Sequence, residues 1–331
     1  MTSYAAAGVD ISAAEENVRR IERHVRSTHG PRVLGNFGAF AGLFHLQDVR
    51  DPVLVASTDG VGTKVLLGVQ LGRYDVIGRD VVNLSVNDVL TTGARPLFFL
   101  DYVGVHAIDH VVMEGLLAGM AAACRANDCA LLGGETAQLP DLYAAGQLDL
   151  AGTVVGVVER ERIIDGAHVS AGDRVWGLPS TGLHTNGFSL ARKLVAGLDL
   201  AADVGGRLGQ SLGQALLQPH PSYYPPLRPI LPQLKAIAHI TGGGIPGNLP
   251  RVLPAHVSVE LDWGAWRVPP IFELLQELGQ IAFDEMLRVF NLGLGLIFVT
   301  DPGTDVRAEC PMALEIGRVV PARAERVVLR R

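Results

Sequence analysis

The segment from Thr58 to Lys64 combines residue types that can bind a nucleotide. It reads Thr-Asp-Gly-Val-Gly-Thr-Lys and directly follows the apolar run Val53–Ser57. An aspartate at the end of a strand can hold a divalent cation, glycine-rich backbone offers N–H groups to phosphate, and lysine adds a positive charge. The spacing is not that of a Walker A loop. A hairpin turn at Asp59 and Gly60 explains the same residues equally well, so this segment alone leaves both interpretations open.

Polar residues interrupt the apolar segment from Asp75 to Thr92, which has the pattern of a helix. Asp80 and Asn87 have the i, i+7 spacing of one helical face, and Asp88 lies on the adjoining face. Because an unpaired buried charge is costly, these carboxylates need a partner, either metal ions or Lys64. The alternative is a pair of solvated acids on a helix surface.

Two further acids border apolar strands in the first half of the chain. Asp101 interrupts the run Pro96–Val105, and Glu135 stands in the sequence Gly-Gly-Glu-Thr over residues 133–136. Each acid taken alone is more typical of a cap or a turn than of a ligand.

The second half of the chain offers two glycine-containing loops. His184 lies in the sequence Gly-Leu-His-Thr-Asn-Gly before an expected helix, where a histidine can transfer a proton or bind an anion. A surface histidine in a turn is the alternative. Thr241-Gly242-Gly243-Gly244 precedes another expected helix and can surround a phosphate, although ordinary helix-entry loops look the same.

These motifs connect the elements of an α+β chain. We expect strands at 53–57, 96–105, 130–132, 151–158, 174–178, 237–240, 257–261 and 294–299, and helices at 15–26, 75–92, 110–127 and 271–278. Ser12 is the expected N-cap of the first helix. The proline-rich stretch 218–232 is expected to be an extended connection. A polar, turn-rich stretch at 166–173 predicts a boundary, giving domains at 1–168 and 169–331.

Composition narrows the class of protein. Lys and Arg total 28 and Asp and Glu total 34, so the net charge is 28 − 34 = −6, which argues against a nucleic-acid partner. No apolar run approaches the roughly 20 residues of a membrane helix, and no leader segment is apparent. The three cysteines cannot all pair with one another. We therefore expect a globular, cytoplasmic protein in a reducing compartment, without a membrane partner.

The ordered set of motifs resembles the phosphoribosylformylglycinamidine cyclo-ligase (AIR synthetase) family over essentially the whole chain. The matching segments are Ala7–Ile11, Thr58–Lys64, Val86–Asp88, Pro96–Tyr102, Gly133–Ala137, Gly156–Glu159, Ile163–Gly166, His184–Leu190, His239–Gly244, Asn248–Pro254 and Phe290–Gly293. Two places depart from the usual family pattern. Three alanines follow Tyr4 where the family usually has charged residues, and the loop at 36–40 has fewer glycines.

The resemblance implies a fold and a reaction. The fold is α+β with two α/β domains: the N-terminal domain forms a β-barrel shared across a homodimer, and the C-terminal domain has a mixed sheet with helices. The reaction is the ATP-dependent closure of formylglycinamidine ribonucleotide to aminoimidazole ribonucleotide in purine biosynthesis, with phosphorylation of the formyl oxygen. Its partners are ATP and formylglycinamidine ribonucleotide, and its cofactor is Mg²⁺.

The resemblance also implies roles for individual residues. The nucleotide would be bound by Asp59, Gly60, Val61, Gly62, Thr63, Lys64, Asn87, Asp88, Asp101, Gly133, Gly134, Glu135 and Thr136. The second substrate would be bound by His184, Thr185, Asn186, Gly242, Gly243 and Gly244. Asp59 and Asp88 would hold the metal, and the catalytic set would be Asp59, Lys64, His184 and Asn186.

Three alternatives stand beside this interpretation. Selenophosphate synthetase, a relative, needs a reactive cysteine or selenocysteine near its N-terminus, whereas the first cysteine here is Cys124. Thiamine-phosphate kinase is the enzymatic alternative, which the matches at 184–190 and 241–254 disfavour. The alternative from another class is an ATP-binding dimer without catalysis, which the presence of Asp59, Lys64 and Asp88 disfavours.

Overall fold

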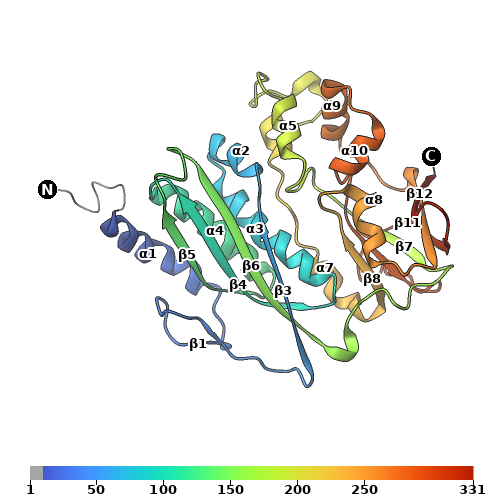
Figure 1. The fold of residues 1–331 in the computed structure, drawn as a ribbon, viewed down its shortest axis with the longest axis horizontal. Coiled ribbons are helices and arrows are strands. Elements are labelled where there is room, and N and C mark those ends of the chain that lie inside the picture. The colour runs from blue at the N-terminus through green and yellow to red at the C-terminus, as the bar shows by residue number, and fades with distance from the viewer. Residues whose placement is uncertain (1–9, 331) are drawn as a thin grey trace. The chain divides into compact units, whose positions relative to one another are not determined.

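The structure is a computed structural model that describes residues 10–330 and contains two compact units (Figure 1). One unit holds the residues up to Val89 together with Arg95–Glu159, and the other holds Leu90–Ala94 and the residues from Arg160 onward. The alanines after Tyr4, and the matching segment at residues 7–11 up to residue 9, lie outside the described residues. No helix in the described part of the chain is long and apolar enough to cross a membrane.

The first unit has a four-stranded mixed sheet with helices on one face. Its elements are α1 (Ile11–Arg26), β1 (Val33–Leu34), β2 (Leu43–Phe44), β3 (Pro52–Gly60), α2 (Lys64–Gln70), α3 (Tyr74–Leu90), β4 (Arg95–Val105), α4 (His110–Ala126), β5 (Ala130–Gln138) and β6 (Leu148–Glu159). The strand order is β3-β6-β4-β5, in which β4 and β5 are parallel and the other neighbours are antiparallel.

Alternating exposure along β3 distinguishes the two faces of this sheet. Leu54 and Thr58 are exposed, whereas Ser57 and Asp59 are half-buried. Ser57 Oγ donates a hydrogen bond of 3.0 Å to Asp88 Oδ2 of α3, so the half-buried face is the one that the helices cover. Figure 1 shows α3 and α4 behind this sheet and no described helix of the unit in front of it.

The opposite face of this sheet, which we call the open face, is largely uncovered within the described residues. Phe44 of β2 packs against Phe98 of β4 with ring centroids 5.5 Å apart, and this is where the β1–β2 segment reaches the open face. The four strands do not close on themselves, and no described sheet forms a barrel within this chain. The barrel that the family resemblance implies would need strands from a second copy.

The second unit has a six-stranded mixed sheet with helices, as expected. Its elements are β7 (Arg174–Pro179), α5 (Phe188–Leu194), α6 (Leu212–Leu216), α7 (Tyr224–Leu227), β8 (Leu234–His239), α8 (Gly244–Asn248), β9 (Val257–Asp262), α9 (Pro270–Gly279), α10 (Phe283–Val289), β10 (Leu294–Thr300), β11 (Leu314–Pro321) and β12 (Val327–Arg330). The strand order is β12-β9-β11-β7-β10-β8, and β12 is parallel to β9. Trp176 lies in the core, and its indole N–H donates to Thr300 Oγ1 at 3.0 Å.

Two expectations about local structure were wrong. Helix α1 begins at Ile11, and its N-cap is Asp10, whose carboxylate accepts from the backbone N–H of Ala13 at 3.1 Å. Ser12 therefore lies inside the helix. The stretch 218–232 is not extended throughout, because it contains α7 and most of a 3₁₀ turn over Arg228–Gln233. Prolines at the first positions of these short helices are compatible with helical backbone, since the N–H they lack would be unpaired there anyway.

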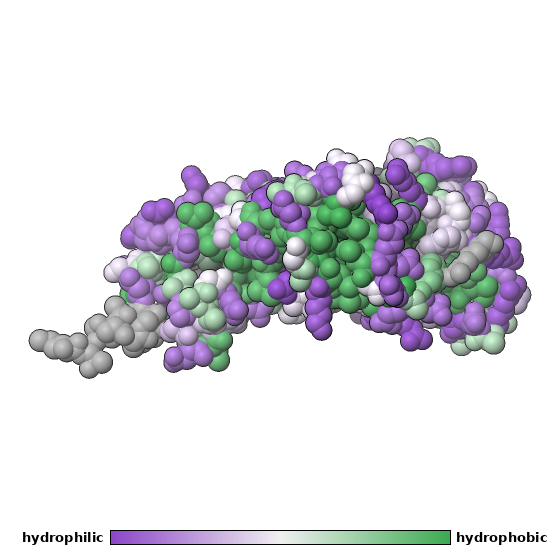
Figure 2. Space-filling model, turned by 90° about the horizontal axis from the view of Figure 1, so that it is seen from above, coloured by the Kyte–Doolittle hydropathy of each residue, from purple (hydrophilic) through white to green (hydrophobic). Residues whose placement is uncertain are grey.

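Apolar side chains are not confined to the interior. Figure 2 shows hydrophobic residues reaching the surface among hydrophilic ones on the face that it presents. The exposed large apolar residues include Leu54, Leu100 and Tyr102, which belong to the open face of the first sheet.

Candidate functional site

A row of four residues crosses the sheet of the first unit. Asp59 of β3 pairs with Gly152 of β6, and Gly152 pairs in turn with Asp101 of β4. On the other side of Asp101, Gly134 of β5 completes the row. Cross-strand partners point to the same face, so both aspartates lie on the helix-covered face. A β-carbon at Gly134 would lie 2.2 Å from Asp101 Oδ1, which means that only glycine leaves room for this carboxylate.

The Asp101 carboxyl has an altered proton affinity. Burial, assisted by the negative charge of Glu135, raises the pKa of Asp101 to about 7. A nearby cation would favour its ionised form. Glu135 itself is exposed and pairs with Tyr102, which places it on the open face. The structure therefore brings Asp59 and Asp101 to one face and leaves Glu135 on the other.

Asp59 and Asp88 have their carboxylates on the helix-covered side of the sheet. Asp59 Oδ1 accepts from the backbone N–H of Gly60 at 2.7 Å, and Asp88 Oδ2 is held by Ser57, two residues before Asp59. Within residues 10–330, no three His, Cys, Asp or Glu side chains are grouped closely enough to hold a metal ion by themselves. Two carboxylates fit Mg²⁺ bound together with a nucleotide, because that ion commonly takes one or two carboxylates and completes its coordination with phosphate and water.

Lys64 has a buried partner. Its Nζ lies 2.6 Å from Asp80 Oδ2, and both side chains are fully buried. Burial lowers the pKa of Lys64, and the attraction of Asp80 opposes that effect. Of the two partners considered for the Asp80 carboxylate, the structure has Lys64. The ammonium group joins α2 to α3, and the partner that it contacts is the Asp80 carboxylate.

The remaining predicted nucleotide residues are spread over the connection after β3, helix α3 and strand β5. Gly60, Val61, Gly62 and Thr63 form the connection from β3 to α2, and Gly62 has a φ of +64°, which favours glycine. Val61 is fully buried, so its side chain serves the core. Asn87 is fully buried in α3, Gly133 lies on the open face beside Leu100, and Thr136 is half-buried beside Val103.

In the second unit, His184 has an unusual backbone conformation. It is a non-glycine residue with a φ of +61°, and only 1% of its surface is exposed. Its Nε2 accepts from the backbone N–H of Thr181 at 3.3 Å, and its ring is stacked on His220 with centroids 4.1 Å apart. A strained residue of this kind persists only where its surroundings hold it, and such residues concentrate at functional sites.

The two predicted loops of the second unit lie next to each other. A β-carbon at Gly242 would lie 3.3 Å from Asn186 Oδ1, so the glycine loop and the His184–Asn186 loop are in close contact. Asn248 holds the glycine loop, because its Nδ2 donates to the carbonyls of Thr241, Gly242 and Gly244 at 3.3, 3.2 and 2.9 Å. The structure thus brings together the two predicted loops of the second unit, one of which precedes α5 and the other of which follows β8.

Sequence analysis missed the residues that hold the His184 loop. Asn291 Nδ2 donates to Gly182 O at 2.8 Å, and Asn291 Oδ1 accepts from Ser180 Oγ at 2.8 Å. His220 and His239 pack beside His184. Asn291 and His239 lie in family-like segments and could have been found there, whereas His220 lies in the proline-rich stretch and gave no signal.

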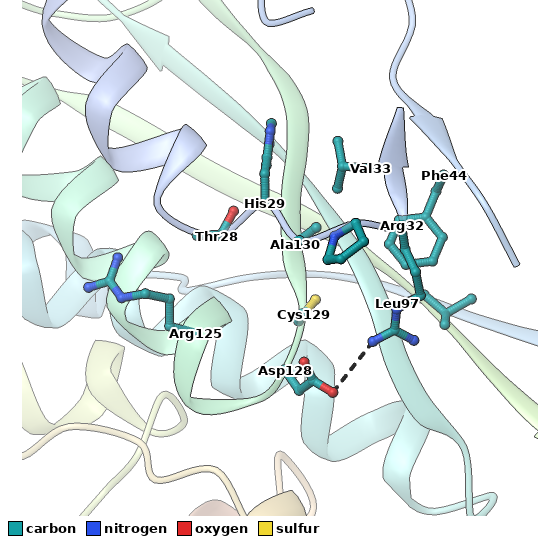
Figure 3. Close-up of a pocket in the computed structure, with 12 residues that line it drawn as sticks. Thr28, His29, Arg32, Val33, Phe44, Leu97, Arg125, Asp128, Cys129 and Ala130 are labelled. Atoms are coloured by element: carbon teal, nitrogen blue, oxygen red, sulfur yellow. Dashed lines mark hydrogen bonds and ion pairs between the residues drawn. The ribbon is translucent and has the colours of Figure 1, made fainter. Parts of the chain in front are cut away.

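The first unit also contains a pocket of about 230 Å³ that includes none of the predicted residues (Figure 3). It is lined by Thr28, His29, Gly30, Pro31, Arg32, Val33, Phe44, Leu97, Arg125, Asp128, Cys129 and Ala130. Its two arginines have partners: Arg32 lies 3.5 Å from Asp128, and Arg125 donates to Ser27 Oγ. The candidate site therefore rests on the predicted residues and not on this pocket.

Comparison with known proteins identifies the family. The family described as "AIR synthase related protein, N-terminal domain" matches residues 41–158, and "AIR synthase related protein, C-terminal domain" matches residues 170–330. Proteins named phosphoribosylformylglycinamidine cyclo-ligase are similar over nearly their whole length. That of Sorangium cellulosum is 48% identical over 317 residues, covering 92% of this chain and 90% of the relative. That of Myxococcus xanthus is 46% identical over 337 residues, covering 98% and 97%. The chain belongs to the phosphoribosylformylglycinamidine cyclo-ligase family.

Solved structures show how widely this fold is used outside the cyclo-ligase family. Thiamine-monophosphate kinase from Stenotrophomonas maltophilia K279a superposes with a TM-score of 0.67 at 21% identity, covering 94% of both chains. The hydrogenase maturation protein HypE in complex with ATP superposes with a TM-score of 0.64 at 21% identity, covering 94% of this chain and 90% of that one. At this level of identity, the likeness concerns the fold alone.

Proposed function

We propose that the protein closes the imidazole ring of aminoimidazole ribonucleotide from formylglycinamidine ribonucleotide, with ATP converted to ADP and phosphate, in purine biosynthesis. The observation that carries this proposal is the 48% identity, over 92% of the chain, to a protein named for that ligase reaction. ATP phosphorylates the formyl oxygen and so turns it into a leaving group. A nitrogen of the same substrate then attacks the formyl carbon, and phosphate departs from that carbon.

ATP binds in the first unit, along the β3–α2 connection. Asp59 and Asp88 would hold Mg²⁺, which would offset the negative charge of the transferring phosphoryl group. The backbone of Gly60–Thr63 faces the phosphates. Asn87, Asp101, Gly134 and Thr136 complete the nucleotide site, and the nearby cation stabilises the ionised form of Asp101. Gly133 and Glu135 were also predicted to bind the nucleotide, but they lie on the opposite face of β5.

Lys64 takes part mainly by positioning. Its buried ion pair with Asp80 fixes the start of α2 against α3. That pair sets where the β3–α2 connection ends and where Asp88 lies on α3. Phosphoryl transfer depends chiefly on such positioning, because small displacements of reacting groups are costly in rate.

Formylglycinamidine ribonucleotide binds in the second unit. His184, Thr185 and Asn186 contact its formyl and amidine groups, and the backbone of Gly242–Gly244 contacts its polar groups. Support comes from the contact between Gly242 and Asn186 and from the strained, fixed position of His184. His184 holds a proton near the atoms that react.

The active assembly is a homodimer in which the open faces of two first-unit sheets meet in a shared barrel. Support comes from the apolar residues of that face, among which Leu54 is 63%, Leu100 is 37% and Tyr102 is 36% exposed. Burying such residues is favourable. We also retain the domain division at 168/169 and a cytoplasmic location, with which the three free cysteines agree.

The decisive experiment is incubation of the purified protein with formylglycinamidine ribonucleotide and MgATP. We expect aminoimidazole ribonucleotide and ADP in equal amounts by mass spectrometry, and ATP consumption that depends on the second substrate. A parallel incubation with thiamine monophosphate tests the kinase alternative. Formation of thiamine diphosphate without aminoimidazole ribonucleotide would overturn the proposal, as would rapid ATP hydrolysis without either substrate.

A further inference from the structure

Three buried histidines from three separate segments are stacked in the second unit. His184 lies before α5, His220 lies before α7, and His239 ends β8; they are 1%, 0% and 6% exposed. The rings of His184 and His220 are 4.1 Å apart and nearly parallel, at 21°. The rings of His220 and His239 are 5.1 Å apart. The three rings therefore form one packed group, which we call the histidine cluster.

The hydrogen bond from Thr181 assigns the tautomer of His184. A backbone N–H can only donate, so His184 Nε2 must accept through its lone pair. The neutral ring therefore carries its hydrogen on Nδ1. A second proton, on Nε2, would set one N–H against another and would break this bond.

His220 and His239 are joined by a hydrogen bond between their rings. Their Nε2 atoms are 3.1 Å apart, a hydrogen-bonding distance that requires one hydrogen on the line between them. Without a hydrogen, two lone pairs would face each other, and with two hydrogens, two N–H groups would collide. The other nitrogen of His220, Nδ1, is 3.4 Å from Thr185 Oγ1. His220 is therefore held at both ring nitrogens.

Tyr223 and Gly295 pack closely against the three rings and restrain them sterically. Tyr223 packs against His184 with centroids 6.2 Å apart, and its hydroxyl donates to Pro179 O at 2.9 Å. Burial raises the pKa of Tyr223 well above its usual range, so the phenol stays neutral. From β10, Gly295 faces the cluster, where a β-carbon would lie 2.4 Å from His184 Cε1.

We propose that His220 is a positioning residue for ring closure: stacked on His184 and tied to His239, it holds the His184 ring against the backbone N–H of Thr181, and this contact keeps His184 neutral with its hydrogen on Nδ1. In this form His184 donates a hydrogen bond to the substrate through Nδ1, and its Nε2 does not act as a base. The inference rests on the proposed function, in which His184 contacts formylglycinamidine ribonucleotide. The strained backbone of His184 explains why a packed neighbour such as His220 is needed, because a φ of +61° persists only when neighbours hold it.

The first test observes the rings directly and does not depend on activity. Nitrogen NMR of histidine-labelled protein, from about pH 5.5 to about 8, reports the tautomer and charge of each ring. We expect His184 to remain neutral with its hydrogen on Nδ1 throughout this range. A His184 ring that becomes charged within this range, or that carries its hydrogen on Nε2, would overturn the proposal.

The second test uses two variants of His220. His220→Phe keeps a stacked ring without the link to His239, and His220→Gln keeps a polar group without the ring. We expect both to lower kcat by roughly 10- to 100-fold while KM for each substrate changes less than about 3-fold. In His220→Phe the acid limb of the kcat profile should move to higher pH, because His184 can then take up a proton more easily.

One further variant serves as the control, and the results that would overturn the role of His220 differ from those that would overturn the proposed function. His256→Gln, at an exposed position, should leave kcat and its pH profile unchanged. Unchanged kcat and an unmoved acid limb in folded His220→Phe and His220→Gln would overturn the role of His220. A wild-type protein that makes no aminoimidazole ribonucleotide would instead overturn the proposed function. Because NMR needs only the wild-type chain, a variant that fails to fold does not prevent the test.

Discussion

Asp59 and Asp149 make the same local hydrogen bond but lie on opposite faces of the first sheet. Asp59 Oδ1 accepts from Gly60 N at 2.7 Å, and Asp149 Oδ1 accepts from Leu150 N at 2.9 Å. Asp149 is exposed, whereas Asp59 lies on the helix-covered face near Asp88. This pair of residues allows the proposed metal ligand Asp59 to be compared with an acid that makes the same local bond on the other face.

We predict that Asp59→Asn lowers kcat by about 100- to 1,000-fold, because an amide cannot balance the charge of the cation. Asp149→Asn should leave kcat unchanged. Circular dichroism melting curves of both variants should match the wild type. A folded Asp59→Asn protein with a near-normal rate at saturating MgATP would exclude Asp59 as a metal ligand.

A second prediction concerns pH and Asp101. Because the pKa of this carboxyl is raised from 3.8 to about 7, the folded chain holds a proton between those values that the unfolded chain has released. The free energy of unfolding contributed by Asp101 therefore falls as pH rises through this window, by up to about 1.4 kcal/mol per pH unit, and stays low above it. Asp101→Asn cannot ionise, so it should gain stability relative to wild type on going from pH 5 to pH 8.

Urea unfolding of both proteins in EDTA at the two pH values measures that gain. EDTA removes divalent cations that would favour the ionised carboxylate and hide the effect. A stability difference that is the same at both pH values would show that Asp101 does not titrate in this range.

At the scale of single residues, the sequence predicted which residue types form the candidate site, but it did not predict which partners they have. The carboxylates of α3 were expected to need a partner, and the choice between metal and Lys64 depended on where α2 packs. Glu135 follows two glycines in the sequence, but strand alternation carries it to the open face while Gly134 makes room for Asp101. Such choices depend on pairing between strands, which no local pattern contains.

Strand β10 provides the main prediction at the scale of elements. Its Gly295 lies under the histidine cluster, where a β-carbon would lie 1.9 Å from Tyr223 Oη. We predict that Gly295→Ala lowers the free energy of unfolding by about 1–3 kcal/mol, because an added methyl group in a packed interior forces its neighbours to move. The displaced His184 should also reduce kcat.

Gly303→Ala is the matched control, because an added β-carbon there meets nothing within 4 Å and Gly303 lies in a turn after the same strand. Its free energy of unfolding, measured with urea, should stay within about 0.5 kcal/mol of wild type. Equal stability of the two variants would contradict the close packing at Gly295.

Most of the long elements were predictable and the short ones were not, although β5 covers Ala130–Gln138 where a strand was expected only at 130–132. Helices α3 and α4 and strands β4 and β6 lie close to their expected ranges, because their apolar patterns extend over many residues. Strands β1 and β2 have two residues each, too few to show a period. Helix α7 has four residues, among them two prolines, and its composition suggested an extended chain. His220 was missed because it precedes this helix.

At the scale of the whole molecule, similarity to a known family predicted more about the protein than the periodicity of its apolar residues did. The family was recognisable from ordered motifs and is shown by relatives that align over nearly the whole chain. The order of the strands in the two sheets was not predictable from the sequence. In the first sheet, for example, β6 inserts between β3 and β4, although both precede it in the chain. An assembly with a second copy is also invisible to local patterns, and it leads to the last prediction.

That prediction concerns the open face. Leu54 on the edge strand β3 is 63% exposed, and a charge there would have to be buried if two open faces meet. We predict that wild-type protein sediments as a dimer at micromolar concentration and that Leu54→Asp shifts it towards the monomer by at least about 10-fold in Kd. Val111→Asp, at a 74% exposed position in the first turn of α4, should leave the dimer intact. A monomeric wild type, or a Leu54→Asp protein that dimerises as tightly as wild type, would rule out this face as the dimer interface.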